Sequence, residues 1–394
     1  MSPVIHLYNT KSKSIEEFKP ITYGEVGIYS CGPTVYHYAH IGNLRSYVFA
    51  DILRRMFVHA GYKVQHLINI TDVGHMVGDG DDGQDKLEKG ALREGKSAWE
   101  IAKLYTDAFF DDLDALNIPR DAYTFPRATD HIREQVGLIK ALEMSGHTYT
   151  ISGGVYFDTS TFPTYADFAH LDIEGLQSGA RVEENKEKRN ITDFALWKFS
   201  PKDEQRQMEW GEESGVPWGK GFPGWHIECS AMSMKYLGEQ FDIHTGGIDH
   251  IPVHHTNEIA QSESITGKTY VNYWMHNNFL NDTTGKMSKS NDDFLTLPVI
   301  NEKGYSSLAY RYLLLMTHYR KEINFSFESL QAAATAYNKL RYWCHMNKNN
   351  NGNINEKYLN DCIDALNDDL NTSKCLAVLH ILLNDKTIPE EDKY

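Results

Sequence analysis

Two short stretches of the chain contain residue types suited to binding a triphosphate. The first runs from His40 to Asn43 (HIGN) and places a glycine between an imidazole and an amide. Gly42 allows a nucleotide to approach the backbone closely, while His40 and Asn43 can donate hydrogen bonds to phosphate oxygens. If a helix begins here, its N-terminal N–H groups and its dipole also favour an anion. Taken alone, the pattern is more typical of a helix cap or a surface histidine.

The second stretch runs from Lys286 to Ser290 (KMSKS) and follows Gly285. Lys286 and Lys289 could surround a pyrophosphate leaving group, and such charges help most in the transition state, where negative charge develops. A pair of loop lysines is usually only a solvated charged segment. A match over all five residues, combined with the first stretch, favours phosphate chemistry over that interpretation.

Four residues have side chains that bind metals, namely Cys31, Cys229, His254 and Glu258. Thiolate, imidazole and carboxylate are all acceptable ligands of Zn²⁺. Only His254 and Glu258 are linked by spacing, because residues four apart share one face of a predicted helix. Taken singly, each cysteine is more often a small buried hydrophobe, and the histidine a satisfied core residue. Spacing alone therefore does not group the four.

The elements around the first stretch have the pattern of a βαβ unit. Residues 27–30 form a predicted strand, residues 43–60 a predicted helix with apolar positions at helical spacing, and residues 64–69 a second strand. This order favours an α/β fold with a doubly wound parallel sheet and right-handed crossovers. A further Gly pair, Gly246 and Gly247, precedes the predicted metal helix and permits close approach of a ribose or adenine, although it could equally be an ordinary turn.

The remaining chain divides into a loop, an insertion and a helical end. Residues 78–86 are acidic and Gly-rich, which predicts a loop, and residues 97–116 form a predicted helix with Ser97 as its N-cap. Residues 121–201 combine a helix, a hairpin region around 152–154 and a polar segment, and we interpret them as an insertion into the main sheet domain. From residue 326 the pattern is helical, apart from an Asn-rich linker at 347–355.

Composition sets the general class of the protein. A chain of 394 residues that is 41% hydrophobic can bury a sizeable core in two or three structural units. Its five widely spaced cysteines predict reduced thiols or metal ligands. The formal net charge of −15 argues against general nucleic-acid affinity, so an RNA partner requires a local basic surface. The absence of a signal-peptide pattern and of long apolar runs predicts a cytoplasmic protein that does not bind membranes. The oligomeric state stays open, with a monomer favoured.

Several longer stretches carry a resemblance to a known family. They closely resemble stretches of the cysteinyl-tRNA synthetases, and they are residues 31–36 (CGPTVY), 69–72 (NITD), 224–232 (GWHIECSAM), 254–258 (HHTNE) and 273–276 (YWMH). The HIGN and KMSKS stretches resemble the two signature motifs of class I aminoacyl-tRNA synthetases, with Asn43 in place of a final histidine. The likeness runs from about His6 to beyond Ser326.

This resemblance implies an enzyme that activates L-cysteine with ATP, forms cysteinyl-adenylate and transfers cysteine to tRNA(Cys). It implies a zinc ion, which selects the cysteine thiol and is held by Cys31, Cys229, His254 and Glu258, and Mg²⁺ that accompanies ATP. Catalytic roles are implied for His40, Asn43, Lys286 and Lys289. Contacts with ATP are implied for His40, Gly42, Asn43, Gly247, Asp249, Trp274, Met287 and Lys289. Contacts with cysteine are implied for Gly32, Thr71, Trp225 and His244.

The resemblance also implies a domain organisation. We expect a Rossmann-like class I catalytic domain at residues 1–325, with an α+β insertion at about 117–202 and the KMSKS region at about 280–325. Residues 326–394 are expected to form a partial helical bundle, without the separate anticodon-binding domain that family members carry.

Two alternatives stay open at this point. The related cysteine ligase of mycothiol synthesis has similar ATP and zinc motifs but transfers cysteine to an amino sugar, and Glu258 and the match around Asn257 favour the synthetase over it. A non-catalytic, tRNA-binding paralogue would usually lose His40, Lys286 and Lys289, all of which this chain keeps.

Overall fold

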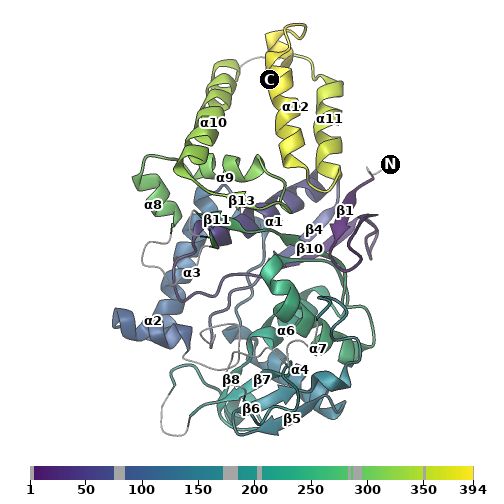
Figure 1. Cartoon of the computed structure of the whole chain (residues 1–394), viewed down its shortest axis with the longest axis vertical. Coiled ribbons are helices and arrows are strands. Elements are labelled where there is room, and N and C mark those ends of the chain that lie inside the picture. Colours follow the sequence, from purple (N-terminus) through teal and green to yellow (C-terminus); the bar gives the residue numbers. More distant parts are fainter. Residues whose placement is uncertain are drawn as a thin grey trace.

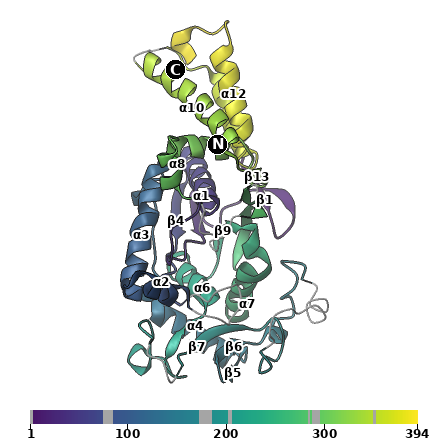
Figure 2. The same ribbon diagram turned by 60° about the vertical axis from the view of Figure 1, so that its left-hand side comes forward.

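The computed structural model of the protein describes residues 4–74, 85–171, 185–201, 206–282, 285–286, 295–348 and 352–393. Figure 1 shows a body built on a parallel sheet, with an antiparallel sheet at its lower end and helices of the C-terminal region at its upper end. The rotated view in Figure 2 shows the same order along the long axis. Among the described residues, no helix combines the length and apolar character needed to cross a membrane.

The central sheet has four parallel strands in the order β10-β9-β3-β4. Their bounds are β3 Glu25–Ser30, β4 Lys63–Ile68, β9 Phe241–Gly247 and β10 Val271–Asn277. Successive side chains of a strand point to opposite faces. Ile28 accordingly joins one core cluster with Phe49 of helix α1 (Ile41–His59), whereas Tyr29 joins another with Met232 of helix α6 (Trp225–Leu237). Helices therefore cover both faces, which confirms the predicted α/β fold.

Helices flank the sheet and frame the region above its carboxyl ends. Their bounds are α1 Ile41–His59, α2 Lys86–Glu94, α3 Ala98–Ala115, α6 Trp225–Leu237, α7 Thr256–Thr266, α8 Leu297–Glu302 and α9 Ser307–Leu315. Ser97 caps α3 in a capping box with Glu100, which confirms the predicted N-cap. The sequence reading missed α2, which Asp85 caps. Of the acidic loop predicted at 78–86, residues 78–84 lie outside the described residues, and Lys86 begins α2 instead of ending the loop.

The inserted unit contains an antiparallel sheet of four strands in the order β5-β6-β7-β8. Its elements are α4 Ile132–Met144, β5 Thr148–Ile151, β6 Gly154–Phe157, β7 Phe194–Phe199 and β8 Gly221–Pro223. Gly154 has φ +153°, and a Cβ there would lie 2.1 Å from the Trp197 carbonyl oxygen, so this tight pairing requires glycine. The expected insertion limits stay a prediction, and β8 lies beyond residue 202.

Small strands and the C-terminal helices complete the described chain. The strands are β1 His6–Asn9, β2 Ser14–Glu17, β11 Leu280–Asp282, β12 Gly285–Lys286 and β13 Ile323–Asn324. The helices are α10 Phe327–Asn347, α11 Glu356–Asn367 and α12 Thr372–Asn384. Ser326 caps α10, and residues 352–355 before α11 are not helical, which matches the helical segment and linker expected from the sequence.

A buried ion-pair cluster joins α1 to α9 and yields a stability prediction. Asp51 is fully buried, pairs with Arg311 at 2.5 Å and accepts hydrogen bonds from Arg55 and Tyr123. Asp51→Asn removes the charge that balances the buried Arg311 guanidinium, so we expect the free energy of unfolding to fall by about 3 to 5 kcal/mol. Chemical denaturation at pH 7 measures this change.

The matched control is Asp107→Asn, which breaks an exposed ion pair with Lys103 on α3. Exposed pairs of this kind contribute at most about 1 kcal/mol, so this variant should stay close to the parent protein. If the free energy of unfolding fell equally in the two variants, the Asp51 cluster would not be a main stabilising contact between α1 and α9.

Candidate active site and metal cluster

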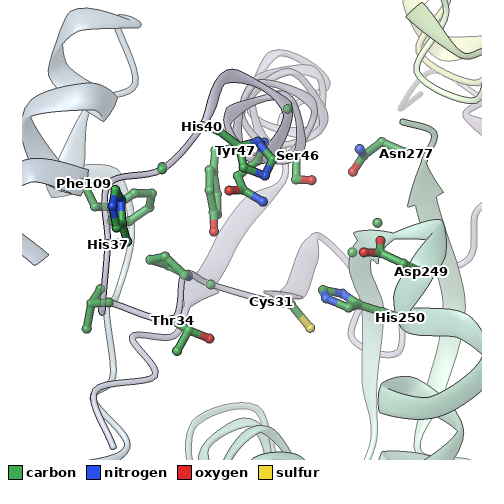
Figure 3. A pocket seen from close by; sticks show the side chains of 18 of the residues that line it. Cys31, Thr34, His37, His40, Ser46, Tyr47, Phe109, Asp249, His250 and Asn277 are labelled. Atoms are coloured by element: carbon green, nitrogen blue, oxygen red, sulfur yellow. The ribbon is translucent and has the colours of Figure 1, made fainter. Parts of the chain in front are cut away.

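A cavity of about 370 Å³ opens above the carboxyl ends of the parallel strands. Its walls come from the loop after β3, the start of α1, the start of α6, the ends of β9 and β10, and side chains of α2 and α3. Figure 3 shows His37 and Phe109 on one side of this cavity, with Asp249, His250 and Asn277 on the other. This is the position at which open α/β sheets bind their ligands.

The start of α1 brings three of the predicted phosphate-binding residues to the cavity. His40 is the N-cap of α1, and its Nδ1 accepts a hydrogen bond of 3.1 Å from the Asn43 backbone N–H. Because Nδ1 accepts this bond, the hydrogen of the neutral ring is assigned to Nε2, and Nε2 can act as a donor. Gly42 and Asn43 line the cavity beside His40, and the helix dipole directs its positive end to the same place.

The end of β9 supplies the opposite wall. Gly247 and Asp249 both line the cavity, as the sequence predicts for contacts with the nucleotide. Gly246 packs against two histidine rings, since a Cβ there would lie 2.6 Å from His250 Nδ1 and 2.8 Å from His255 Cε1. Glycine at this position therefore lets the strand end close to the rings that follow it.

The structure brings the four predicted metal ligands together. Cys31 follows β3, Cys229 lies in α6, Glu258 lies in α7, and His254 belongs to a π-helical turn, Ile251–His255, that leads into α7. All four are buried, and their ligand atoms lie within 4.8 Å of one another. Single π turns often mark functional sites. Residues from three separate parts of the chain thus form one buried cluster, and of the four only Cys31 lines the cavity.

His254 and Glu258 each use one side-chain atom for contacts outside the cluster, and each directs a second ligand atom into it. His254 uses Nδ1 to contact His226 Nδ1 at 2.9 Å, and its Nε2 lies 3.0 Å from Glu258 Oε1. Glu258 Oε2 accepts hydrogen bonds from His244 and Tyr270. Neither His254 Nε2 nor Glu258 Oε1 has a hydrogen bond of good geometry among the described residues. Their outer partners fix the ring and the carboxylate, as in zinc sites, so the donor set fits this metal.

Electrostatics favours a cation at this cluster. Burial raises the pKa of a thiol, but the hydrogen bond from Cys31 and the charge of His254 lower the pKa of Cys229 to about 6. Burial likewise raises the pKa of Glu258, and the charges of His244 and His254 outweigh it and lower that pKa. Two anionic ligands therefore share a buried space, a condition that binding of Zn²⁺ satisfies.

A second donor set overlaps the first and was missed by the sequence reading. Cys31, His244, His255 and Glu258 also hold ligand atoms within 4.8 Å of one another. His255 Nε2 lies 3.2 Å from Cys31 Sγ, and its Nδ1 contacts His276 at 2.8 Å. Only the position of His255 beside His254 in the sequence could have pointed to it.

Some predicted substrate-binding residues line the cavity and others lie behind it. Gly32 and Trp225 line it, while Thr71 is buried and donates a hydrogen bond of 3.0 Å to Glu228. Trp274 is fully buried and stacks on His244, with ring centroids 4.8 Å apart. Its side chain points to the face of the sheet covered by α6 and α7. The structure does not bring Trp274 to the cavity, and its expected contact with adenine stays a prediction.

The lysine motif is described only in part. The backbone of Lys286 belongs to β12 and pairs with Asn281 of β11. Met287 and Lys289 lie outside the described residues. The roles expected for these three residues therefore stay predictions.

Gly32 carries a prediction about the metal cluster. Its N–H donates a hydrogen bond of 2.7 Å to the Asn69 side chain, and a Cβ at Gly32 would lie 1.5 Å from the Asn69 carbonyl oxygen. Gly32→Ala must therefore displace the loop that carries Cys31, and we expect the zinc content per chain to fall. Gly137→Ala on α4 is the control, because a Cβ there meets nothing within 4 Å. Elemental analysis of the purified variants decides, and full zinc content in Gly32→Ala would contradict this account of the loop.

Comparison with known proteins gives the family. Residues 17–335 match the family model described as tRNA synthetases class I (C) catalytic domain. A cysteine–tRNA ligase of Burkholderia lata is 52% identical over 384 residues, covering 97% of this chain and 80% of that relative. A cysteine–tRNA ligase of Treponema denticola is 49% identical over 413 residues, covering 98% of this chain and 83% of the relative. Neither alternative considered from the sequence receives support from these matches.

Solved structures agree with this assignment at the level of the fold. A Mycobacterium tuberculosis methionyl-tRNA synthetase in complex with methionyl-adenylate superposes with a TM-score of 0.63 at 16% identity, covering 94% of this chain and 87% of that one. A leucyl-tRNA synthetase of Agrobacterium radiobacter in a ternary complex gives a TM-score of 0.65 at 11% identity, covering 95% and 82% of the two chains. The chain therefore belongs to the cysteine–tRNA ligase family of class I aminoacyl-tRNA synthetases.

Proposed function

We propose that the protein activates L-cysteine with ATP to give cysteinyl-adenylate and pyrophosphate, and then transfers the cysteinyl group to tRNA(Cys). The observation that carries this proposal is the convergence of Cys31, Cys229, His254 and Glu258 in one buried cluster, in which Cys31 lines the same cavity as the start of α1. The proposed amino-acid site and the proposed phosphate site would therefore share one cavity.

Zinc bound by these four residues would hold the substrate thiol as a thiolate, a ligand that the hydroxyl group of serine replaces poorly. A purely apolar pocket discriminates weakly between side chains of such similar size. Trp225 forms the adjoining wall, because its ring lies 4.2 Å from the His254 ring between centroids. Gly32 lines the same end of the cavity, and Thr71 and His244 lie directly behind it as proposed supports of the cysteine site.

The start of α1 is the proposed site of the ATP phosphates. The cysteine carboxylate would attack the α-phosphorus, so no protein nucleophile is needed, and positioning and charge stabilisation supply the catalysis. His40 and Asn43 donate hydrogen bonds to phosphate oxygens, and Gly42 allows close approach of the nucleotide. Lys286 and Lys289 are the proposed partners of the leaving pyrophosphate, with Mg²⁺ accompanying ATP. Gly247 and Asp249 across the cavity are the proposed contacts of the adenosine, with Met287 and Trp274 as further candidates.

Charging of tRNA tests the proposal as a whole. Purified protein, ATP, Mg²⁺ and radiolabelled cysteine are incubated with tRNA(Cys), and acid-precipitable label is counted. We expect cysteinyl-tRNA to accumulate in proportion to enzyme concentration, and a noncognate tRNA from the same source to stay uncharged. Formation of cysteinyl-adenylate without transfer to any tRNA would contradict the second half of the proposal.

A further inference from the structure

Arg45 of α1 binds an unusual number of main-chain carbonyl groups. Arg45 is buried, and only 3% of its surface is exposed to solvent. The guanidinium donates hydrogen bonds to two separate segments of the chain. The acceptors are the carbonyl oxygens of Asn278 (2.8 Å), Phe279 (2.5 Å), His318 (3.4 Å), Tyr319 (3.1 Å) and Lys321.

The first of these segments is a wall of the cavity. Asn278 and Phe279 line the cavity and lead directly into β11. Leu280 lines it as well, and its carbonyl oxygen lies 3.6 Å from the position a Cβ on Gly42 would take. Arg45 thus ties the wall formed by residues 277–280 to the same helix that presents His40 and Gly42 to the cavity.

The second segment is held from both sides. Arg45 contacts its carbonyl groups, whereas Asp369, which follows α11, contacts its side chains. The Asp369 carboxylate accepts hydrogen bonds from the Tyr319 hydroxyl at 2.6 Å and from Arg320 Nε at 2.7 Å. Segment 318–321 also continues into β13, which pairs in parallel with β11. The C-terminal helices, the cavity wall and the start of α1 therefore meet around Arg45 and segment 318–321, and we call these residues the joint.

The joint is energetically demanding, which argues for a specific role. Burial lowers the pKa of Arg45 to about 10, and the charges of Tyr310 and Glu322 offset only part of this effect. Asp369 and Leu370 both have φ +55°, a conformation that is strained for a residue other than glycine. Carbonyl groups on two segments accept the hydrogen bonds of the guanidinium. A planar fork with five N–H groups suits this task, and a lysine ammonium does not.

We propose that Arg45 is a positioning residue for the activation step, which sets the distance between the start of α1 and the cavity wall at residues 277–280. This inference rests on the proposed function, because it assigns the two sides of the cavity to one reaction. Arg45 itself does not line the cavity, so its effect passes through backbone geometry. Misplacement of reacting groups by about 1 Å can cost roughly 100-fold in rate, so small shifts at the joint should be visible in kcat.

The test compares Arg45→Lys with Arg54→Lys in cysteine-dependent ATP–pyrophosphate exchange. Arg54 lies on the same helix and donates one hydrogen bond of 3.0 Å to the Ala122 carbonyl, outside the cavity lining. At a temperature at which both proteins are fully folded, we expect Arg45→Lys to lower kcat roughly 10- to 100-fold, while the KM for cysteine and the zinc content stay near those of the parent. Arg54→Lys should keep the parental kcat.

Three results would overturn the inference. If Arg45→Lys had the parental kcat, Arg45 would have no positioning role. The same conclusion would follow if a lowered melting temperature and a reduced fraction of active sites accounted for the whole loss of kcat. If Arg45→Lys does not fold, Arg45→Gln takes its place and the same kcat comparison applies. A parent protein without any exchange activity contradicts the proposed function and this inference together, whereas an active parent with an equally active variant overturns only the role of Arg45.

Discussion

A Cys229→Ser variant is expected to lose zinc and, with it, the ability to activate cysteine. Cys229 is buried in α6, and its pKa of about 6 makes it an anionic ligand at neutral pH. Serine offers a hydroxyl group that stays protonated and binds zinc poorly. Loss of an outer-shell partner already costs 10- to 100-fold in metal affinity, so removal of this thiolate should cost roughly 100-fold or more. Zinc content after dialysis against a weak chelator, and cysteine-dependent exchange, measure the two effects.

The matched control is Cys344→Ser on α10, which makes the same chemical change at a partly exposed thiol outside the cluster. It should retain both the metal and the activity. A Cys229→Ser protein that keeps full zinc content would contradict the proposed ligand set, because the metal would then be bound elsewhere.

The second large effect is expected at the start of α1. His40→Asn keeps an N-cap residue, since asparagine caps helices well, but it removes the imidazole that lines the cavity at the proposed phosphate site. Removal of one well-placed donor to a developing negative charge typically costs roughly 100- to 1000-fold in kcat. We therefore expect kcat for pyrophosphate exchange to fall by that amount, with a melting temperature close to that of the parent.

His59→Asn at the opposite end of α1 is the control for this substitution. His59 is exposed and lies in the last turn of the helix, so the variant should lose little stability and no activity. If His40→Asn and the parent had equal kcat, the proposed role of His40 in the activation step would be wrong, and its part would be limited to capping.

Local patterns predicted those parts of the site that one element determines. The spacing of His254 and Glu258 indicated a shared helix face, and the structure places their ligand atoms 3.0 Å apart. Ser97 and Glu100 predicted a helix start that the structure confirms. The strand, helix and strand around residues 27–69 gave the α/β fold, because apolar periodicity is a local property of the chain.

Features that depend on distant segments could not be predicted from spacing. Cys31 and Cys229 join the cluster only because β3 and α6 pack together, and family resemblance rather than pattern grouped them. Arg45 looks like an ordinary residue of α1 until segments more than 200 residues away supply its partners. Trp274 points to the face of β10 that α6 and α7 cover. The sequence could not predict this face, because a strand that is buried on both faces shows no alternation of apolar and polar residues.

Cysteine-dependent ATP–pyrophosphate exchange, run beside serine and repeated after zinc removal, tests the central claim most directly. The account predicts rapid exchange with cysteine, little or none with serine, loss of exchange when zinc is removed and recovery when zinc is returned. Exchange that is unchanged in zinc-free protein, or that is equally fast with serine, would contradict the claim that the Cys31, Cys229, His254 and Glu258 cluster selects cysteine through a bound metal.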